Sequence, residues 1–165
     1  MKALVTGGRG FIGSFLVEEL LRSGFEVNCL LRKKKNELGW LEGLAFNYIE
    51  GDLHNDESLK QSVKGVDYVF HLAGATKARN MEEFDRINAD GTRNLLEATV
   101  KANPKIDKFV LVSSLAAVGP STNGHPKAES ELAQPISNYG RSKLEAEQIA
   151  LSFAQKLPVA ILRPP

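Results

Sequence analysis

The sequence predicts an α/β protein whose core is a doubly wound parallel β-sheet with helices on both faces. Three observations support this fold class. Short apolar runs alternate along the chain with segments of helical periodicity. A glycine-rich turn joins the first apolar run to the first helical segment, and polar residues follow the ends of several apolar runs. In doubly wound sheets, ligands bind at this carboxyl edge of the strands.

Six short apolar segments bounded by turn residues are predicted as strands: residues 2–6, 26–31, 45–50, 67–72, 108–113 and 158–162. Four segments with helical spacing or capping residues are predicted as helices: 11–23, 56–63, 81–103 and 138–156. Gly24 and Pro104 are expected to end the first and third helices. Residues 36–43 are predicted as a loop or short helix, and residues 115–137 as a long loop. The expected strand order is 3-2-1-4-5-6, with right-handed crossovers.

The turn after the first strand carries glycines at the spacing of a dinucleotide-binding loop. Gly7 allows a tight turn, Gly10 lets a pyrophosphate approach the backbone, and Gly13 lets the helix pack closely on the strand. The free N–H groups and the positive dipole end of the helix would face the phosphates. The alternative is a strand, turn and helix that merely happen to be rich in glycine. Because strand, spacing and helix agree, we predict a Rossmann-type, three-layer α/β/α domain over residues 1–165.

The composition favours an ordinary globular domain. The 165 residues are 42% hydrophobic and 25% charged, and the net charge of +1 gives no argument for a nucleic-acid or membrane partner. Cys29 is the single cysteine, so no disulfide can form within the chain, and it reads as a buried small hydrophobe. We see no signal peptide and no membrane-length apolar run, and we predict a cytoplasmic protein without a metal site.

Tyr139 and Lys143 lie four residues apart in a predicted helix, which places both side chains on one face. Tyrosine ordinarily has a pKa of about 10, too high for an efficient base near neutrality. A nearby ammonium favours the phenolate, so the two residues are a plausible acid/base pair. The same spacing also occurs in ordinary surface pairs. Ser113 and Ser114 close the fifth strand, where a hydroxyl could bind a substrate oxygen or simply end the strand.

Together these motifs resemble the extended short-chain dehydrogenase/reductase family, which holds nucleotide-sugar epimerases and dehydratases and the dihydroflavonol-reductase-like enzymes. The matching segments lie in the family's order along the chain: residues 6–13, 51–53, 71–74, 88–92, 112–114, 139–143 and 163–164. One departure is Val118-Gly119-Pro120, where relatives often have Val-Tyr-Gly. Relatives also continue into a helical substrate-binding lobe that this chain lacks, so we interpret the sequence as an N-terminal, cofactor-binding half.

The resemblance implies specific roles. Tyr139 would be the catalytic acid/base, Lys143 would favour its phenolate form and hold the nicotinamide ribose, and Ser114 would bind the reacting oxygen. Asp52 would accept a hydrogen bond from the adenine amino group, and Asn88 would be structural, although some relatives use it in a proton relay. The residues assigned to cofactor binding are Gly7, Arg9, Gly10, Phe11, Ile12, Gly13, Arg32, Asp52, Leu53, Leu72, Ala73, Gly74, Asn88, Ser113, Tyr139 and Lys143.

The end of the second strand favours NADP over NAD, although NAD remains possible. An acidic residue there would accept a hydrogen bond from the ribose 2′-hydroxyl of NAD, but the position carries Arg32. Its guanidinium could bind a 2′-phosphate, with Arg9 of the glycine loop nearby. For the lysines at positions 33–35, a solvated basic loop is the better interpretation.

The leading functional hypothesis is an NAD(P)-dependent oxidoreductase, epimerase or dehydratase that acts on a small carbonyl or nucleotide-sugar substrate. The alternatives are a non-catalytic NAD(P) sensor and an isolated cofactor-binding domain. A sensor would have no need for both Tyr139 and Lys143, which argues against it. A homodimer could form through the helices at 81–103 and 138–156, as in many relatives.

Overall fold

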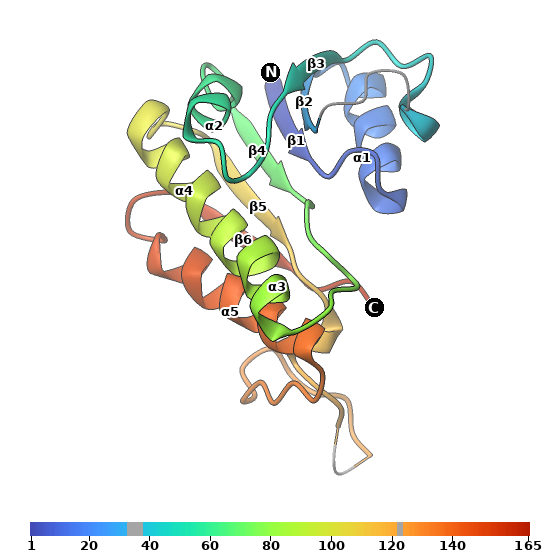
Figure 1. The fold of residues 1–165 in the computed structure, drawn as a ribbon, viewed down its shortest axis with the longest axis vertical. Coiled ribbons are helices and arrows are strands. Elements are labelled where there is room, and N and C mark those ends of the chain that lie inside the picture. The colour runs from blue at the N-terminus through green and yellow to red at the C-terminus, as the bar shows by residue number, and fades with distance from the viewer. Residues whose placement is uncertain (33–37, 122–123) are drawn as a thin grey trace.

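A computed structural model describes residues 1–32, 38–121 and 124–165 and shows one six-stranded sheet (Figure 1). Every strand pair is parallel, and the order is β3-β2-β1-β4-β5-β6, as predicted. The strands are β1 Lys2–Thr6, β2 Glu26–Leu31, β3 Asn47–Glu50, β4 Tyr68–His71, β5 Lys108–Val112 and β6 Val159–Leu162. Their ends differ from the predicted ends by no more than two residues, within the usual uncertainty of element boundaries.

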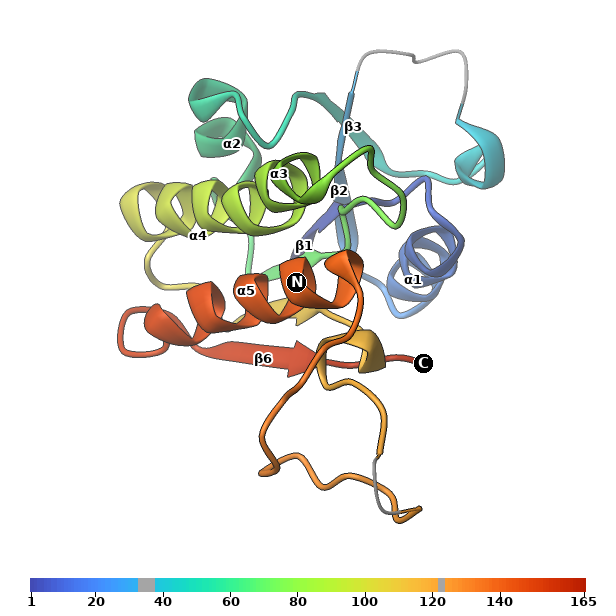
Figure 2. The same ribbon diagram turned by 60° about the horizontal axis from the view of Figure 1, so that its bottom comes forward.

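Helices cover both faces of this sheet, which confirms the three-layer architecture (Figure 2). The helix α1 Phe11–Arg22 and the short 3-10 turn η1 Gly39–Leu41 pack on one face. The helices α2 Asp56–Ser62, α4 Gly91–Ala102 and α5 Asn138–Ser152 pack on the other face, with α4 and α5 side by side. A short turn, η3 Leu115–Ala117, follows β5.

Each central strand contributes side chains to both hydrophobic layers. In β1, Leu4 joins the layer under α2, α4 and α5, whereas its neighbours Ala3 and Val5 join the layer under α1. All three side chains are fully buried. Successive side chains point to opposite faces of a strand, so a strand covered on both faces must be apolar throughout. This requirement explains the continuous apolar runs in the sequence.

The predicted helix at 81–103 is wrong as a single α-helix. The structure divides it into α3 Met81–Phe84, a π-helical segment η2 Asp85–Asp90, and α4. The wider turn of a π-helix changes which side chains share a face, and such segments often lie at functional sites. Periodicity cannot reveal this segment, because the apolar spacing on either side of it still fits a helix. The last predicted helix also ends at Ser152 rather than at residue 156.

Within the described ranges, no helix is long and apolar enough to cross a membrane. The same part of the chain has no cluster of three or more histidine, cysteine or acidic side chains that could hold a metal ion.

Candidate functional site

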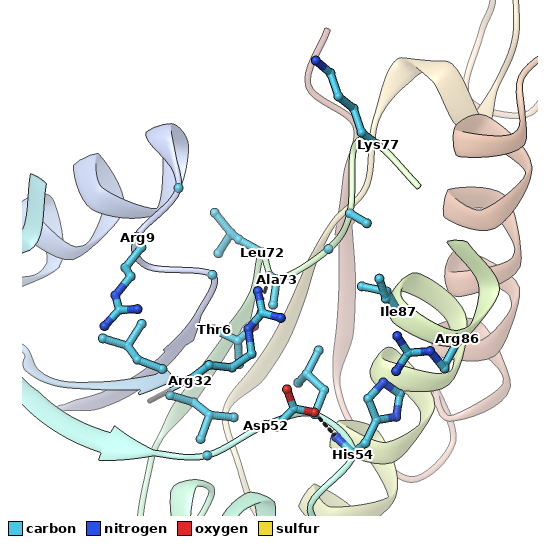
Figure 3. Close-up of a pocket in the computed structure, with 18 residues that line it drawn as sticks. Thr6, Arg9, Arg32, Asp52, His54, Leu72, Ala73, Lys77, Arg86 and Ile87 are labelled. Atoms are coloured by element: carbon cyan, nitrogen blue, oxygen red, sulfur yellow. Dashed lines mark hydrogen bonds between the residues drawn. The ribbon is translucent and has the colours of Figure 1, made fainter. Parts of the chain in front are cut away.

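A groove of about 530 Å³ opens at the carboxyl ends of β1, β2 and β4, where the strand order reverses (Figure 3). Open α/β sheets bind ligands at this point. The groove brings together most of the residues predicted to bind a cofactor: Gly7, Arg9, Gly10, Arg32, Asp52, Leu53, Leu72, Ala73 and Gly74. The other predicted residues do not line it: Phe11, Ile12, Gly13, Asn88, Ser113, Tyr139 and Lys143.

The glycine loop is shaped by close backbone contacts. Gly7 has a positive φ of 75°, and a Cβ at this position would lie 2.5 Å from the backbone nitrogen of Ala73. A Cβ on Gly13 would collide with the carbonyl of Gly7, which explains why α1 can approach the loop so closely. Gly10 is the N-cap residue of α1 and gives no side-chain hydrogen bond to the first turn. Phe11 is 65% exposed. The N–H groups in the first turn of α1 therefore have no side-chain cap and can donate hydrogen bonds to a ligand that extends from the groove.

The groove is strongly basic. Arg9, Arg32, Lys77 and Arg86 line it, and Asp52 is the only acidic side chain among the described residues that do so. In Figure 3, Arg9 and Arg32 lie on the side of the glycine loop, whereas Arg86 lies on the opposite wall beside His54. Four cations against one carboxylate favour an anionic ligand with several phosphate groups.

Asp52 lies two residues after the end of β3, and its carbonyl accepts a hydrogen bond of 3.0 Å from the backbone nitrogen of Asn55 in a turn. One carboxylate oxygen, Oδ1, accepts a hydrogen bond of 2.9 Å from the backbone nitrogen of His54. This bond holds the carboxylate at the floor of the groove, where Figure 3 shows it between Arg32 and His54. Its second oxygen, Oδ2, can therefore accept a hydrogen bond from a ligand amino group.

Lys143 is buried beneath the groove, on the face of α5 that packs against the sheet. Its Nζ donates a hydrogen bond of 2.8 Å to the carbonyl oxygen of Val112. Burial lowers the pKa of Lys143 to about 8, and the charge of Glu147, one turn further on, opposes this shift. The ammonium lies near the groove, because a Cβ on Gly74 would be 3.9 Å from Nζ.

Tyr139 occupies the first turn of α5, four residues before Lys143. The hydroxyl of Ser137 accepts a hydrogen bond of 3.0 Å from the backbone nitrogen of Gly140 and so caps this helix. The ring of Tyr139 is half-buried and packs at 6.2 Å, between ring centres, from Phe84 of α3. The helical spacing holds the phenol and the Lys143 ammonium on one face of α5.

The two serines after β5 differ in their hydrogen bonding. Ser114 Oγ accepts a bond of 3.1 Å from the backbone nitrogen of Ala116 and caps η3, which leaves its proton free to be donated. Ser113 is only 4% exposed, and its hydroxyl has no hydrogen-bond partner among the described residues. The Ser114 hydroxyl can therefore still donate to a ligand oxygen, whereas the Ser113 hydroxyl is buried.

Asn88 lies in the π-helical segment, and all polar groups of its side chain are used within the protein. Its Oδ1 accepts a bond of 2.7 Å from the Ala75 nitrogen, and its Nδ2 donates to the Ala75 carbonyl at 3.1 Å and to Ser142 Oγ at 2.8 Å. Asn88 is 2% exposed. This arrangement leaves no side-chain donor of Asn88 for a ligand.

Sequence reasoning missed several residues that line the groove, among them Thr6, Lys77 and Arg86. Thr6 could have been found, because it directly precedes the glycine turn. Arg86 could not have been found, because the direction in which its side chain points depends on the π-helical segment.

Fold and site together define a dinucleotide-binding domain of the α/β class. The pattern of the family described as "NAD dependent epimerase/dehydratase family" matches residues 3–165, so the chain belongs to this family. Its members are NAD-dependent epimerases, dehydratases and reductases. This finding confirms the resemblance predicted from the motifs.

The individual relatives include both a reductase and an enzyme named for a UDP-linked sugar. The chain is 35% identical over 161 residues to a ceramide reductase of Caulobacter vibrioides, covering 98% of this chain and 44% of that protein. It is 32% identical over 173 residues to a UDP-N-acetyl-alpha-D-glucosaminuronate decarboxylase of Bacillus cytotoxicus, covering 98% of this chain and 53% of that protein. The chain thus spans about half the length of these relatives.

Solved structures agree with this assignment. A UDP-glucuronic acid 4-epimerase from Bacillus cereus in complex with NAD superposes with a TM-score of 0.85 at 30% identity, over 99% of this chain and 55% of that one. MoeE5 in complex with UDP-glucuronic acid and NAD gives a TM-score of 0.82 at 34% identity, over 98% of this chain and 52% of that one.

The residues of the groove fit a nicotinamide dinucleotide. Position 7 has no room for a Cβ, and Gly10 adds no side chain at the mouth of the groove. Uncapped N–H groups at the start of α1 and four cations complement a pyrophosphate. The free oxygen of Asp52 complements an amino group.

Proposed function

We propose that this chain binds NADP in preference to NAD and forms the cofactor half of an oxidoreductase, epimerase or dehydratase. The observation that carries the proposal is the basic groove at the switch point of the sheet, with the buried Lys143 beneath it. Arg32 supports the preference for NADP, because it lies at the end of β2, where an acidic residue would favour NAD.

Three side chains of this chain are proposed to take part in catalysis, two of them in contact with the substrate. The nicotinamide cofactor, when bound, supplies or accepts the hydride. Tyr139 would exchange a proton with the substrate oxygen, and the Lys143 ammonium would favour the phenolate form of that tyrosine. Ser114 would donate a hydrogen bond to the same oxygen, since its proton is not used in capping η3.

The proposed substrate class is a small carbonyl or alcohol, including nucleotide sugars. The support is chemical and comparative: an acid/base tyrosine with a neighbouring lysine suits hydride transfer at such a carbon, and the relatives include a reductase and two enzymes named for UDP-linked sugars. We also propose a cytoplasmic location, and a homodimer through the segments 81–103 and 138–156.

Calorimetric titration of the unmodified protein with NADP and with NAD tests the cofactor assignment. We expect both to bind and NADP to bind more tightly. Binding of neither dinucleotide would contradict the proposal as a whole. A clear preference for NAD would contradict only the proposed role of Arg32.

A further inference from the structure

A chain of buried hydrogen bonds connects the groove to the acid/base helix. We call it the buried polar frame, and it consists of the side chains of Thr6, His71, Asn88, Thr92 and Ser142. None of these residues is more than 2% exposed. They come from β1, β4, η2, α4 and α5, so the frame joins four separate parts of the chain, since α4 directly follows η2.

One arm of the frame passes through His71. Its Nδ1 lies 2.7 Å from Thr6 Oγ1, which accepts a hydrogen bond of 3.2 Å from the Ala73 nitrogen. Its Nε2 lies 3.0 Å from Thr92 Oγ1. Thr92 in turn donates a bond of 2.6 Å to the Asn88 carbonyl. This arm ties the groove segment at Ala73 to the π-helical segment.

These contacts fix the tautomer of His71. A carbonyl oxygen can only accept, so the Thr92 proton must point to Asn88, and Thr92 must accept from Nε2–H of the histidine. Complete burial lowers the pKa of His71 to about 3, and the nearby charge of Lys143 adds to this effect, so the ring is neutral. Nδ1 therefore accepts the proton of Thr6, and every group in this arm is satisfied.

The second arm passes through Ser142. Its hydroxyl accepts a bond of 2.8 Å from Asn88 Nδ2 and donates a bond of 2.8 Å to the backbone carbonyl of Tyr139. The Asn88 amide also holds both backbone groups of Ala75. Both arms therefore meet at Asn88, and the segment 73–75 of the groove is held at its two ends.

We propose that the buried polar frame positions the groove segment 73–75 against the first turn of α5, so that the cofactor is held at a fixed distance from Tyr139. The inference rests on the proposed function. His71, Asn88, Thr92 and Ser142 act as positioning residues and do not touch the reacting atoms. The frame has little freedom to move, because each buried donor would lose its only partner.

The substitution Thr92→Val tests the frame because it preserves the shape of the side chain and removes its hydroxyl. We expect the dissociation constant for NADP to rise about three- to tenfold, the effect of one net hydrogen bond. Thr92→Ser restores the hydroxyl with a smaller side chain, and it should restore the affinity. If Thr92 served only in packing, the valine variant would bind normally and the serine variant would be the weaker one.

Thr99→Val is the matched control. Thr99 is fully buried in the same helix and donates the same kind of bond, at 2.7 Å to the Leu95 carbonyl, but it does not contact the frame. We expect it to leave NADP affinity at the parental value. Parental affinity in Thr92→Val, or equal losses in both valine variants, would overturn the inference.

Nitrogen-15 NMR of the His71 ring gives a readout that depends on neither cofactor nor activity. In the unmodified protein we expect the neutral Nε2–H tautomer throughout pH 5 to 8. In folded Thr92→Val we expect the ring no longer to give the signals of this single tautomer. A ring that titrates in this range, or carries its proton on Nδ1, would overturn the frame even if the valine variant failed to fold. A protein that binds no dinucleotide but shows the expected tautomer would instead contradict the proposed function.

Discussion

Glu147 and Arg163 form a bidentate ion pair beneath the acid/base helix, with bonds of 2.9 Å from Nε to Oε1 and 2.7 Å from Nη2 to Oε2. Glu147 is 2% exposed, and it lies one helical turn beyond Lys143. Glu147 therefore forms an ion pair with Arg163 and also interacts electrostatically with Lys143. The tighter partner, Arg163, fixes the carboxylate at the end of β6 and leaves Lys143 free to bond to the Val112 carbonyl.

Removal of one partner of this pair should be strongly destabilising. We expect Arg163→Met to lower the free energy of unfolding by about 3–5 kcal/mol, because it leaves a buried carboxylate without its main partner. The double variant with Glu147→Leu should lose less than the sum of the two single changes. Urea unfolding measures these values.

The exposed pair Lys60–Asp56 provides the control for this prediction. Lys60→Met should lower the free energy of unfolding far less than Arg163→Met does, because ion pairs in contact with water contribute little to stability. If Arg163→Met lowered the free energy of unfolding by a similarly small amount, the buried pair would not be important for stability.

Lys143 should make the stability depend on pH in the alkaline range. Its folded-state pKa of about 8 lies below its ordinary value of 10.5, so the unfolded chain binds more protons between these pH values. The contribution of Lys143 to stability should therefore rise as pH increases from 8 to 10.5, by about 3 kcal/mol in total.

Comparison with Lys143→Met isolates this effect, since all other groups titrate in both proteins. The free energy of unfolding of the parent, relative to that of the variant, should increase as pH rises from 8 to 10.5. A difference that stays constant with pH would mean that Lys143 titrates normally in the folded protein.

If the proposed function is correct, Tyr139→Phe should abolish nearly all turnover while cofactor binding remains. General acid/base catalysis typically contributes about 10²–10⁴-fold, so the loss should be at least this large. Lys143→Met should impair both cofactor binding and turnover. Ser114→Ala should cause a smaller loss of turnover, and Ser113→Ala a smaller loss still. Single-turnover hydride transfer on a confirmed substrate, with melting temperatures, measures the order.

Tyr68→Phe is the control for the loss of a phenol. Tyr68 packs against Phe25 and Phe70, and it does not line the groove. It should keep parental turnover. Parental rates in Tyr139→Phe would refute the assigned acid/base and favour a sensor that binds the cofactor without catalysis.

Arg32→Asp should narrow or reverse the preference for NADP over NAD. The change replaces a cation that could bind the 2′-phosphate by a carboxylate that can accept from the 2′-hydroxyl. Calorimetric titration of both cofactors measures the ratio of affinities.

Arg93→Asp makes the same change of charge at an exposed position outside the groove. It should leave the NADP to NAD ratio near the parental value. If both variants shift the ratio equally, the preference comes from overall charge and not from a contact of Arg32.

Much of the fold followed from local patterns in the sequence. The apolar runs fixed the six strands, because strands covered on both faces need apolar side chains throughout. The spacing of Gly7, Gly10 and Gly13 predicted the loop, since the backbone geometry there excludes side chains. Predicted residues from four separate segments line one groove, because the carboxyl ends of neighbouring parallel strands lie at one edge.

The sequence alone predicted the glycine loop and the positions of Tyr139 and Lys143, because each depends on spacings within a short stretch of chain. It predicted the strand order through the fold class that these local patterns indicate, since doubly wound sheets of this class share one usual order. Only the tertiary structure decided the π-helical segment, the buried polar frame and the pair of Glu147 with Arg163. Whether a polar side chain can be buried depends on partners from other elements, such as Ser142 for Asn88, 54 positions away. No local period encodes such a partner, so packing of the whole chain had to select it.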